Sequence, residues 1–474
     1  MRLYDVMHAT RNRMMRIIWA LSALHLTGCA VGPDYIRPGV EVPPAFKEME
    51  GWKIAQPRDL EVRGNWWEIF NDPLLNALEE QVDVSNQNLA AAEAQFRKAR
   101  AIVQEARASY FPQVSGTLSN TRSGHGTRSP SSNVNNTHTL QFEANWEADL
   151  WGRIRRTVEE SQANAQASAA DLEATRLSIQ AQLAQTYFQL RTSDAQQQLL
   201  NRTVADYERS LQLTQNQYKA GVAARENVVL AQTQLKTAQA QAIDLGVMRT
   251  QLEHAIALLL GKPPADFALT PAYLAAAVPP VPVGVPSVLL ERRPDIAGAE
   301  RRVAAANAGI GVAVAAYFPD LTVFATGGFQ STHIAQWLTV PSRYWSVGAD
   351  IAQLLFDAGA RRARTDQAIA DYDAEVAAYR QTVLTGFQEV EDNLAALRIL
   401  EQEAQVQNEA LQFSRESVAL TINQYKAGIV SYLNVITVQT TALGNERTAL
   451  DIQSRRLLAC VLLIKALGGG WRGQ

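Results

Sequence analysis

The chain has 474 residues, 47% of them hydrophobic, so it can bury a sizeable core and, on length alone, could form two or three domains. Its formal net charge is −3 at pH 7, from 44 basic and 47 acidic side chains. This balance argues against a nucleic-acid-binding surface, and we expect no nucleic-acid partner.

The first 28 residues are typical of an export signal. Three arginines between residues 11 and 16 precede the apolar run IIWALSALHL, which is too short to span a membrane as a mature helix. The run leads into LTGC at residues 26–29, which resembles the lipobox of bacterial lipoproteins, where the cysteine is acylated and becomes the first residue. Cys29 is therefore the expected lipid attachment site. The alternative is an ordinary signal with an incidental cysteine.

Alternating apolar and polar residues predict two strands after the signal. In TLQFEANWEADL, residues 139–150, every second side chain is apolar and those between are polar or charged, as in a strand with one apolar face. A weaker alternation follows YFP at residues 110–112. The polar stretch TRSGHGTRSPSSNVNN, residues 121–136, predicts a loop between the two strands.

A very long helical hairpin follows the strands. Arg153 to Ala220 contains no Gly or Pro over 68 residues, and one continuous helix of that length would reach roughly 100 Å. Gly221 interrupts it, and Val222 to Leu260 predicts a return helix. We expect the helical segment before Tyr110 to stack end to end with this return helix. Mostly heptad-like gaps predict helices packed side by side, through Ile179, Leu183, Leu190, Leu200, Val204, Tyr207 and Leu211.

The whole pattern occurs twice, at a constant offset of 207 residues. YFP at 110–112 aligns with YFP at 317–319, and Gly152 aligns with Gly359. The hexapeptide NQYKAG occurs at 216–221 and again at 423–428, each time where a long helix ends. Its glycine stands at the position typical of a left-handed helix C′ residue. The second copy supplies two more predicted strands, which makes four.

Four strands cannot close a barrel alone, and open strand edges in lipid leave unpaired amides that cost several kcal/mol each. Closure would have to come from other copies of the chain. Two copies would give eight strands and a filled interior, and three would give twelve strands and an open lumen. A sandwich core is the alternative interpretation of the same alternation.

The repeats and a proline-rich linker define the expected organisation. Each repeat contains a helix, two strands and a long helical hairpin. The expected segments are a lipoprotein signal peptide at 1–28, a lipid-anchored segment at 29–72, the first repeat at 73–262, an extended connector at 263–286, the second repeat at 287–469 and a tail at 470–474.

The second of the two cysteines, Cys460, lies in the apolar run LLACVLLI and is expected to be a small core residue and not a nucleophile. With Cys29 acylated and Cys460 buried, we expect no intrachain disulfide.

Several motifs together resemble the TolC-like outer-membrane efflux factors, in the lipoprotein branch that includes OprM and NodT. They are CAVGPDYIRP directly after the lipobox, WWEIFNDPLL at 66–75, LLERRPDIAGAERRVAAANAGIG at 289–311, AYFPDLT, DLWGR and the paired YKAG turns. The resemblance covers essentially the whole chain after the signal.

The resemblance implies an α+β membrane protein that forms a homotrimer. Four strands from each subunit would build a twelve-stranded outer-membrane β-barrel, continued by a periplasmic α-barrel of twelve helices. The chain ends and the connector would form an equatorial belt. Such trimers are passive exit ducts for small molecules such as drugs or other toxic compounds. An inner-membrane RND-type transporter supplies the energy, and a periplasmic adaptor, or membrane fusion protein, docks on the helical tips.

The resemblance also assigns roles to residues near the two NQYKAG turns. The adaptor-docking tips would be Tyr218, Lys219, Ala220, Gly221 and Val222, with Tyr425, Lys426, Ala427, Gly428 and Ile429. The alternative is that the two glycines are only helix caps.

The periplasmic gate would lie at Asn227, Asn434 and Thr437, where many members carry carboxylates that form an acidic, cation-binding ring. Neutral side chains cannot form such a ring, which puts cation binding here in doubt. Glu226 either substitutes for these carboxylates or is a solvated helix charge.

Other classes of protein are less compatible with the sequence. No HExxH motif, phosphate loop or nucleophile elbow occurs, and the histidines are scattered, so we expect neither an enzyme nor a metal or cofactor site. A lipid-anchored coiled-coil scaffold would explain the helices but not the four strands. Among ducts, the alternative is the outer-membrane component of an ABC-linked type I protein secretion system.

Overall fold

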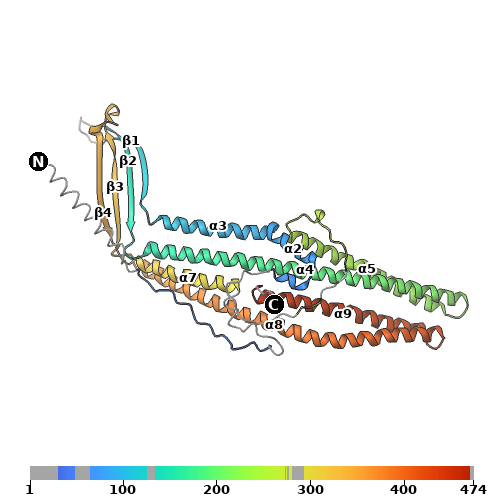
Figure 1. The fold of residues 1–474 in the computed structure, drawn as a ribbon. Helices are drawn as coiled ribbons and strands as arrows, with labels where there is room; N and C mark the ends of the chain where they lie inside the picture. Colours follow the sequence, from blue (N-terminus) through green and yellow to red (C-terminus); the bar gives the residue numbers. More distant parts are fainter. Residues whose placement is uncertain are drawn as a thin grey trace. The chain divides into compact units, whose positions relative to one another are not determined.

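The computed structural model describes residues 30–48, 65–124, 134–272, 274, 277–279 and 293–469. Seven α-helices and four strands lie in these residues (Figure 1). In chain order they are α2 (Pro73–Ser85), α3 (Gln87–Ala108), β1 (Gln113–Gly124), β2 (Val134–Ala148), α4 (Arg153–Lys219), α5 (Arg225–Leu259), α7 (Pro294–Ala315), β3 (Asp320–Ser331), β4 (Arg343–Ala352), α8 (Ala360–Lys426) and α9 (Tyr432–Ala466). Short 3₁₀ turns lie at Trp66–Phe70, Pro264–Asp266, Ile334–Gln336 and Val340–Ser342.

The element bounds confirm the internal duplication. Helices α3 and α7 have 22 residues each, α4 and α8 have 67 each, and α5 and α9 have 35 each. Both ends of every pair are related by the same offset of 207 residues, as are both ends of β1 and β3. The two repeats therefore fold alike over almost their whole length.

The chain divides into two compact units, which are described separately here. The first contains residues 1–39, 95–169 and 298–379, and the second contains residues 40–94, 170–297 and 380–474. The long helices α4 and α8 each begin in the first unit and end in the second. None of the described helices is long and apolar enough to cross a lipid bilayer.

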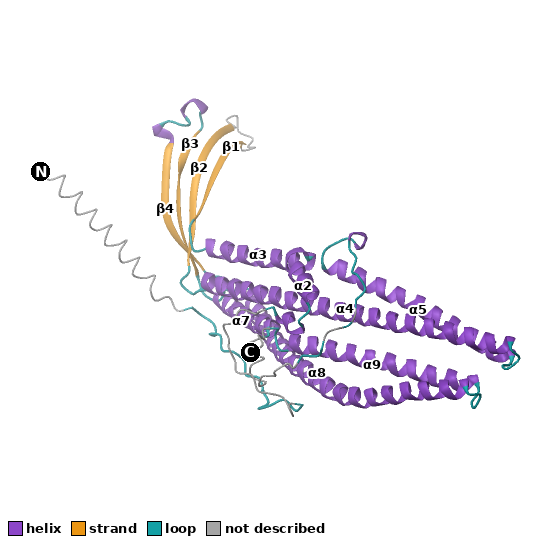
Figure 2. Cartoon of the chain, turned by 45° about the vertical axis from the view of Figure 1, so that its right-hand side comes forward, coloured by secondary structure: helices purple, strands orange, loops and turns teal. Residues whose placement is uncertain are grey.

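The first unit carries one antiparallel sheet with strand order β1-β2-β3-β4 (Figure 2). Residues 121–136 were predicted to form a loop, but strand pairing continues into this segment. Thr121 pairs with Thr137, and Ser123 pairs with Asn135. The polar side chains there do not prevent pairing, because the ladder between β1 and β2 is formed by backbone groups. β1 and β4 are the edge strands of this sheet.

The register places the apolar residues of all four strands on one face. Val114 lies opposite Ala144, which lies opposite Ala325, which lies opposite Val347. Large apolar side chains on this face remain open, with Phe142 55%, Trp345 79% and Val347 69% exposed. A sandwich core would bury these side chains, so that interpretation is wrong for the described chain. An exposed apolar sheet face is typical of a surface that meets lipid or another apolar partner.

Both long helices follow a strand of the sheet, and each begins with the same kind of N-terminal cap. A glycine with positive φ precedes each helix, Gly152 at 82° and Gly359 at 90°. A nearby carboxylate, from Asp149 before α4 and from Asp357 before α8, accepts hydrogen bonds from amides of the first turn. These bonds pair donors that a helix N-terminus leaves unsatisfied.

In the second unit, the WWEIFNDPLL motif anchors the start of the first repeat. Trp66, Trp67 and Phe70 are buried in the main hydrophobic cluster of this unit. Asp72 then caps α2, accepting hydrogen bonds from the amides of Leu74 and Leu75, while Pro73 occupies the first helical position. The motif thus packs apolar side chains and starts a helix in consecutive residues.

The return helices end where the shorter helices begin, as expected from the sequence. Asn86 accepts the amides of Asn88 and Leu89 at the start of α3, and its side-chain NH₂ donates to the carbonyl of Leu259, the last residue of α5, at 2.7 Å. In the second repeat, Arg293 stands before α7 and donates to the carbonyl of Ala466, the last residue of α9, at 3.2 Å. One side chain joins two helices end to end in each repeat.

Candidate functional site

The first helical tip is a glycine-capped turn between α4 and α5. Gly221 has a φ of 73°, and its amide donates to the carbonyl of Tyr218 at 2.9 Å. The amide of Val222 donates to the carbonyl of Gln217 at 2.9 Å. This pattern satisfies the last carbonyls of the helix. The side chain of Val222 is 77% exposed just beyond the cap.

The second tip, between α8 and α9, repeats this backbone. Gly428 has a φ of 74°, its amide donates to the carbonyl of Tyr425 at 3.0 Å, and the amide of Ile429 donates to Gln424 at 2.9 Å. Ile429 is 72% exposed. Both NQYKAG segments therefore end a long helix and leave one apolar side chain exposed at the turn.

The side chains of the two tips differ although their backbones agree. Tyr218 is 47% exposed, whereas Tyr425, its counterpart in the second repeat, is 9% exposed. The hydroxyl of Tyr425 donates to the side-chain oxygen of Gln217 at 2.6 Å, so the second tip is bonded to the last turn of α4. The same hexapeptide therefore places its tyrosine in two different environments.

A second tyrosine, Tyr432 at the start of α9, strengthens this contact between the hairpins. It packs against Tyr425 with ring centroids 5.4 Å apart and belongs to a buried cluster with Ala231 and Val435. Burial, with the nearby Tyr425, raises the pKa of Tyr432 to about 12. The corresponding residue of the first repeat is Arg225, which is exposed. Sequence reasoning missed this asymmetry.

The residues expected at the gate lie in the first two turns of the return helices. Asn227 is half-buried on α5, while Asn434 and Thr437 are exposed on α9. The hydroxyl of Thr437 donates to the carbonyl of Leu433 at 3.0 Å. Within the described part of a single chain, no hydrogen bond joins Asn227 to the other two. Glu226 is an exposed acid in the first turn of α5, a favourable place for a negative charge.

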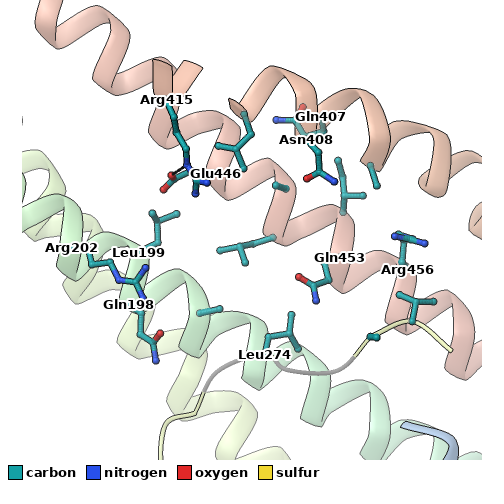
Figure 3. Close-up of a pocket in the computed structure, with 18 residues that line it drawn as sticks. Gln198, Leu199, Arg202, Leu274, Gln407, Asn408, Arg415, Glu446, Gln453 and Arg456 are labelled. Atoms are coloured by element: carbon teal, nitrogen blue, oxygen red, sulfur yellow. Dashed lines mark hydrogen bonds and ion pairs between the residues drawn. The ribbon is translucent and has the colours of Figure 1, made fainter. Parts of the chain in front are cut away.

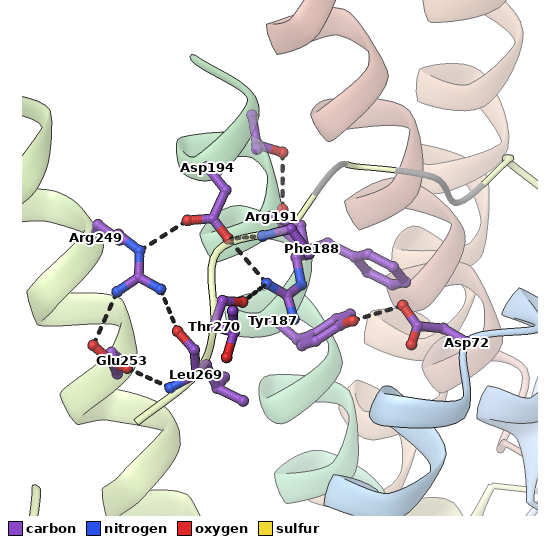
Figure 4. Close-up of polar contacts among 11 residues, drawn as sticks. Asp72, Tyr187, Phe188, Arg191, Asp194, Arg249, Glu253, Leu269 and Thr270 are labelled. Carbon is purple, nitrogen blue, oxygen red and sulfur yellow. Dashed lines mark hydrogen bonds and ion pairs between the residues drawn. The ribbon is translucent and has the colours of Figure 1, made fainter. Parts of the chain in front are cut away.

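A buried ion cluster fastens the connector to the first hairpin (Figure 4). Asp194 on α4 is 1% exposed and contacts Arg191 at 2.9 Å and Arg249 of α5 at 2.8 Å. Arg249 also pairs with Glu253 at 3.0 Å and donates to the carbonyl of Leu269. These charges hold the start of the connector against both helices. The spacing of three residues between Arg191 and Asp194, and of four between Arg249 and Glu253, could have indicated these ion pairs from the sequence. Their contact with the connector could not be predicted in this way.

The segment that follows the lipobox belongs to the first unit and is hydrogen-bonded to residues around the start of α4. The amide of Val31 donates to the carbonyl of Trp151, in the turn between β2 and α4, at 3.0 Å. Arg156, near the start of α4, donates to the carbonyl of Val31 and pairs with Asp34 at 2.8 Å. Cys29 itself lies outside the described residues.

The described residues contain no group of three or more His, Cys, Asp or Glu side chains that could hold a metal ion. Cys460 is fully buried in α9, and burial raises the pKa of its thiol to about 12. It is a core residue, as the sequence indicated.

A family model for outer membrane efflux proteins matches the chain twice, over residues 78–262 and 285–469. The two matches are separated by the same 207 residues that relate the structural elements. The family model therefore recognises each repeat as a whole unit.

Curated relatives align over nearly the full chain. The toluene efflux pump outer membrane protein TtgC of Pseudomonas putida is 31% identical over 466 residues, covering 96% of this chain and 95% of its own. The solvent efflux pump outer membrane protein SrpC, also of P. putida, is 31% identical and covers 94% and 97%. The pyoverdine export outer membrane protein OpmQ of Pseudomonas aeruginosa is 29% identical and covers 97% and 98%.

Solved structures agree with the fold. The outer-membrane channel OprN is 32% identical, with a TM-score of 0.87 over 94% of this chain and 100% of its own. The open-state MtrE outer membrane channel of Neisseria gonorrhoeae is 27% identical, with a TM-score of 0.82 over 93% and 98%. The sequence, the duplicated fold and these matches lead to one conclusion: the chain belongs to the outer membrane efflux protein family, a family of outer-membrane channels and not a class of enzyme.

Proposed function

We propose that three copies of this efflux protein form the exit duct of a tripartite pump, which conducts small molecules passively from the periplasm to the outside. Each copy supplies four strands to a shared twelve-stranded barrel and two helical hairpins to a periplasmic tunnel. Cys29 carries the lipid anchor. A periplasmic adaptor and an inner-membrane RND-type transporter are the partners.

The observation that carries this proposal is the open sheet. Its apolar face is exposed and both of its edges, β1 and β4, lack a strand partner within the described chain. Open edges in lipid are costly, so the sheet must be closed by β1 of one copy pairing with β4 of the next. Three copies give twelve strands, which is wide enough for a lumen, while two give eight and a filled interior.

The adaptor docks at the two tips, through the residues from Tyr218 to Val222 and from Tyr425 to Ile429. Two exposed apolar side chains, Val222 and Ile429, stand at the ends of the hairpins with no covering side chain within the described chain. The same hydrogen-bonded glycine cap precedes each of them. Such side chains on a fixed backbone suit a helical partner that buries them.

The gate lies one turn further along, at Asn227, Asn434 and Thr437. The contacts of Tyr425 and Tyr432 with α4 bind the second hairpin to the first, which supports a closed arrangement at this level. Neutral side chains at the gate leave it without an acidic ring.

Small molecules are the proposed cargo. The relatives that align over the whole chain are named for pumps of toluene, solvents and antibiotics and for pyoverdine export. The alternative is protein secretion with an ABC transporter, and the crosslinking experiment described next distinguishes the two.

A cysteine placed at Ala223 or Ser431, just past each cap, provides that experiment. After crosslinking in intact cells, mass spectrometry identifies the captured proteins. Capture of an adaptor that belongs to a proton-driven pump supports the proposal, and capture of an ABC-linked adaptor replaces it with protein secretion. Capture of only other subunits of the same protein contradicts the docking role. Matched cysteines at Val84, exposed on α2 away from the tips, report background capture.

A further inference from the structure

The described chain has two features that passage through the duct does not require. One is a cavity of about 640 Å³ in the second unit, with walls from α4, α8 and α9 (Figure 3). Its walls mix polar and apolar side chains, and Arg415 there is already paired with Glu446 at 2.6 Å, so no single ligand chemistry is indicated. The other is the loop between β3 and β4, residues 332–342, at the end of the sheet opposite the helices (Figure 2).

This loop is apolar and exposed. Its sequence, THIAQWLTVPS, contains no Asp, Glu, Lys or Arg. The side chains of Ile334, Leu338 and Val340 are 62–71% exposed. The matching segment of the first repeat, 207 residues earlier at 125–135, is HGTRSPSSNVN and is almost entirely polar. A connection at this place therefore does not need apolar residues, and those of the second repeat indicate a surface that meets an apolar partner.

Hydrogen bonds within the loop fix its backbone. Its two 3₁₀ turns pair amides with carbonyls of the same loop, for example Ser342 with Thr339 at 3.1 Å. The hydroxyls of Thr339 and Ser342 both donate to the carbonyl of Gln336, at 2.6 and 2.7 Å. Unpaired backbone groups are costly in lipid, and these groups already have partners.

The loop folds onto the apolar face of the sheet. The ring of Trp337 lies 5.9 Å from the ring of His138 on β2, measured between centroids. His138 stands two residues before Leu140 on the same strand, so both side chains point to the apolar face. The hydroxyl oxygen of Ser331, the partner of His138 on β3, accepts the amide of His333 at 3.1 Å. Because β2 is separated from β4 by β3, the loop leans away from the open edge at β4.

Two side chains mark the level of the sheet that the loop reaches. The indole Nε1 of Trp337 donates to the carbonyl of Phe329 at 3.3 Å. Arg343, the exposed first residue of β4, pairs with Phe329 across the ladder, so Trp337 and Arg343 stand at one level. Tryptophan is enriched at membrane–water interfaces, and arginine there keeps its charge among the headgroups. Further along β4, the same face carries the exposed side chains of Trp345 and Val347.

We propose that this loop is an interfacial anchor in the outer leaflet of the outer membrane. Its three exposed apolar side chains lie among the upper parts of the lipid acyl chains, while Trp337 and Arg343 lie at the headgroups. The inference rests on the proposed function, because the apolar face of the sheet meets lipid only if the sheet spans the membrane in a closed barrel.

A fluorophore on Leu338→Cys tests the proposal with the full-length protein in vesicles of phosphatidylethanolamine and phosphatidylglycerol. With Cys29 acylated and Cys460 buried, the added thiol is the one that reacts. A lipid with a nitroxide on its upper acyl chain should quench most of the fluorescence, while iodide in the water should quench little. The same label at Val347, on the apolar face, should behave alike. At Ser123, on the opposite face of β1, iodide should be the stronger quencher.

Leu338→Asp should move a label at Val340 out of the lipid, because a carboxylate disfavours insertion. The ratio of lipid to iodide quenching should then reverse. Gln330→Asp is the matched control, since it places the same charge on the opposite face of β3, and it should leave the label at Val340 in lipid.

Two results for the label at Leu338 would overturn the proposal. Quenching by iodide would place the loop in water, and quenching by neither reagent would place it against another copy of the chain. In both cases a label at Val347 that is still quenched by the lipid leaves the barrel and the duct proposal standing. If the label at Val347 also escapes the lipid quencher, the sheet does not face lipid and the proposed duct fails as well.

Discussion

Asn86 and Arg293 occupy the same position in the two repeats, and each donates a side-chain hydrogen bond to the last carbonyl of a return helix. The amide of Asn86 is sufficient for this in the first repeat. Arg293 does more, because its guanidinium also pairs with Glu389 at 2.5 Å and with Asp295 at 2.6 Å.

Arg293→Ala should destabilise the protein. The side chain is 8% exposed, and its removal leaves Glu389 and the carbonyl of Ala466 without their donor. The carboxylates of Glu389 and Asp295 are 42% and 39% exposed, so most of the loss comes from the buried carbonyl of Ala466, which costs about 1–3 kcal/mol when left without a donor. The unfolding temperature of the detergent-extracted protein should therefore fall by a few degrees. Arg455→Ala, whose side chain is half exposed and whose nearest carboxylate is 3.6 Å away, should change it little. Equal effects of the two variants would contradict the role of Arg293 at the junction.

Glu79→Gln should stabilise the protein at neutral pH. Glu79 on α2 is fully buried, and neither of its carboxyl oxygens has a hydrogen-bond partner within the described chain. Burial, with the nearby Asp83, raises the pKa of Glu79 well above its usual value of 4.5. The folded chain therefore keeps Glu79 protonated over a pH range in which the unfolded chain has already ionised it.

The sign of the effect follows from this difference. Below pH 4.5 both states are protonated and Glu79 adds no pH dependence, while above it stability falls as pH rises towards the folded-state pKa. Glu79→Gln removes this loss of stability, because glutamine does not ionise over this pH range. Thermal unfolding between pH 4 and pH 8 should show a flatter profile for the variant. Glu80→Gln, on the exposed side of the same helix, serves as the control, and a flatter profile there too would contradict the assignment.

Val222→Asp and Ile429→Asp should abolish adaptor capture without changing thermal stability. Both side chains are more than two-thirds exposed, so a charge there costs the isolated protein little. In the docked state the same charge would be buried without a partner. Crosslinking through a cysteine at Ala223 measures the loss, and Val84→Asp provides the control. Undiminished capture by both tip variants would place the adaptor elsewhere.

Tyr425→Phe should loosen the closed duct. The variant loses the 2.6 Å hydrogen bond to Gln217 that joins the second hairpin to the first, worth about 1 kcal/mol per subunit. Channels in planar bilayers should therefore conduct more often. Tyr218→Phe is the matched control, since it is the same change at the exposed counterpart in the first repeat. If both variants conduct alike, the contact of Tyr425 does not control the opening.

The sequence predicted the repeats, the long helices, the turns and all four strands, because these depend on local periodicity and on glycine placement. It could not predict that strands continue through polar residues such as Thr121 and Ser123, since ladder pairing outweighs side-chain preference there. It also could not separate Tyr218 from Tyr425, whose flanking residues are identical.

The buried charges were the other gap in the sequence analysis. Asp194 and Arg249 lie 55 residues apart and meet a connector carbonyl that no periodic pattern indicates. The buried Nε of Arg456, the counterpart of Arg249, has no hydrogen-bond partner within the described chain, and this became evident only from the structure.

Fusing two copies in one chain has a consequence for recognition. The glycine caps of both tips have the same backbone hydrogen bonds, but Tyr218 is exposed at the first tip and Tyr425 is buried at the second. A partner that reads backbone shape meets the same site twice on each subunit. A partner that contacts the side chains finds two different sites. Because both repeats lie in one chain, residues at one tip can be substituted without changing the other.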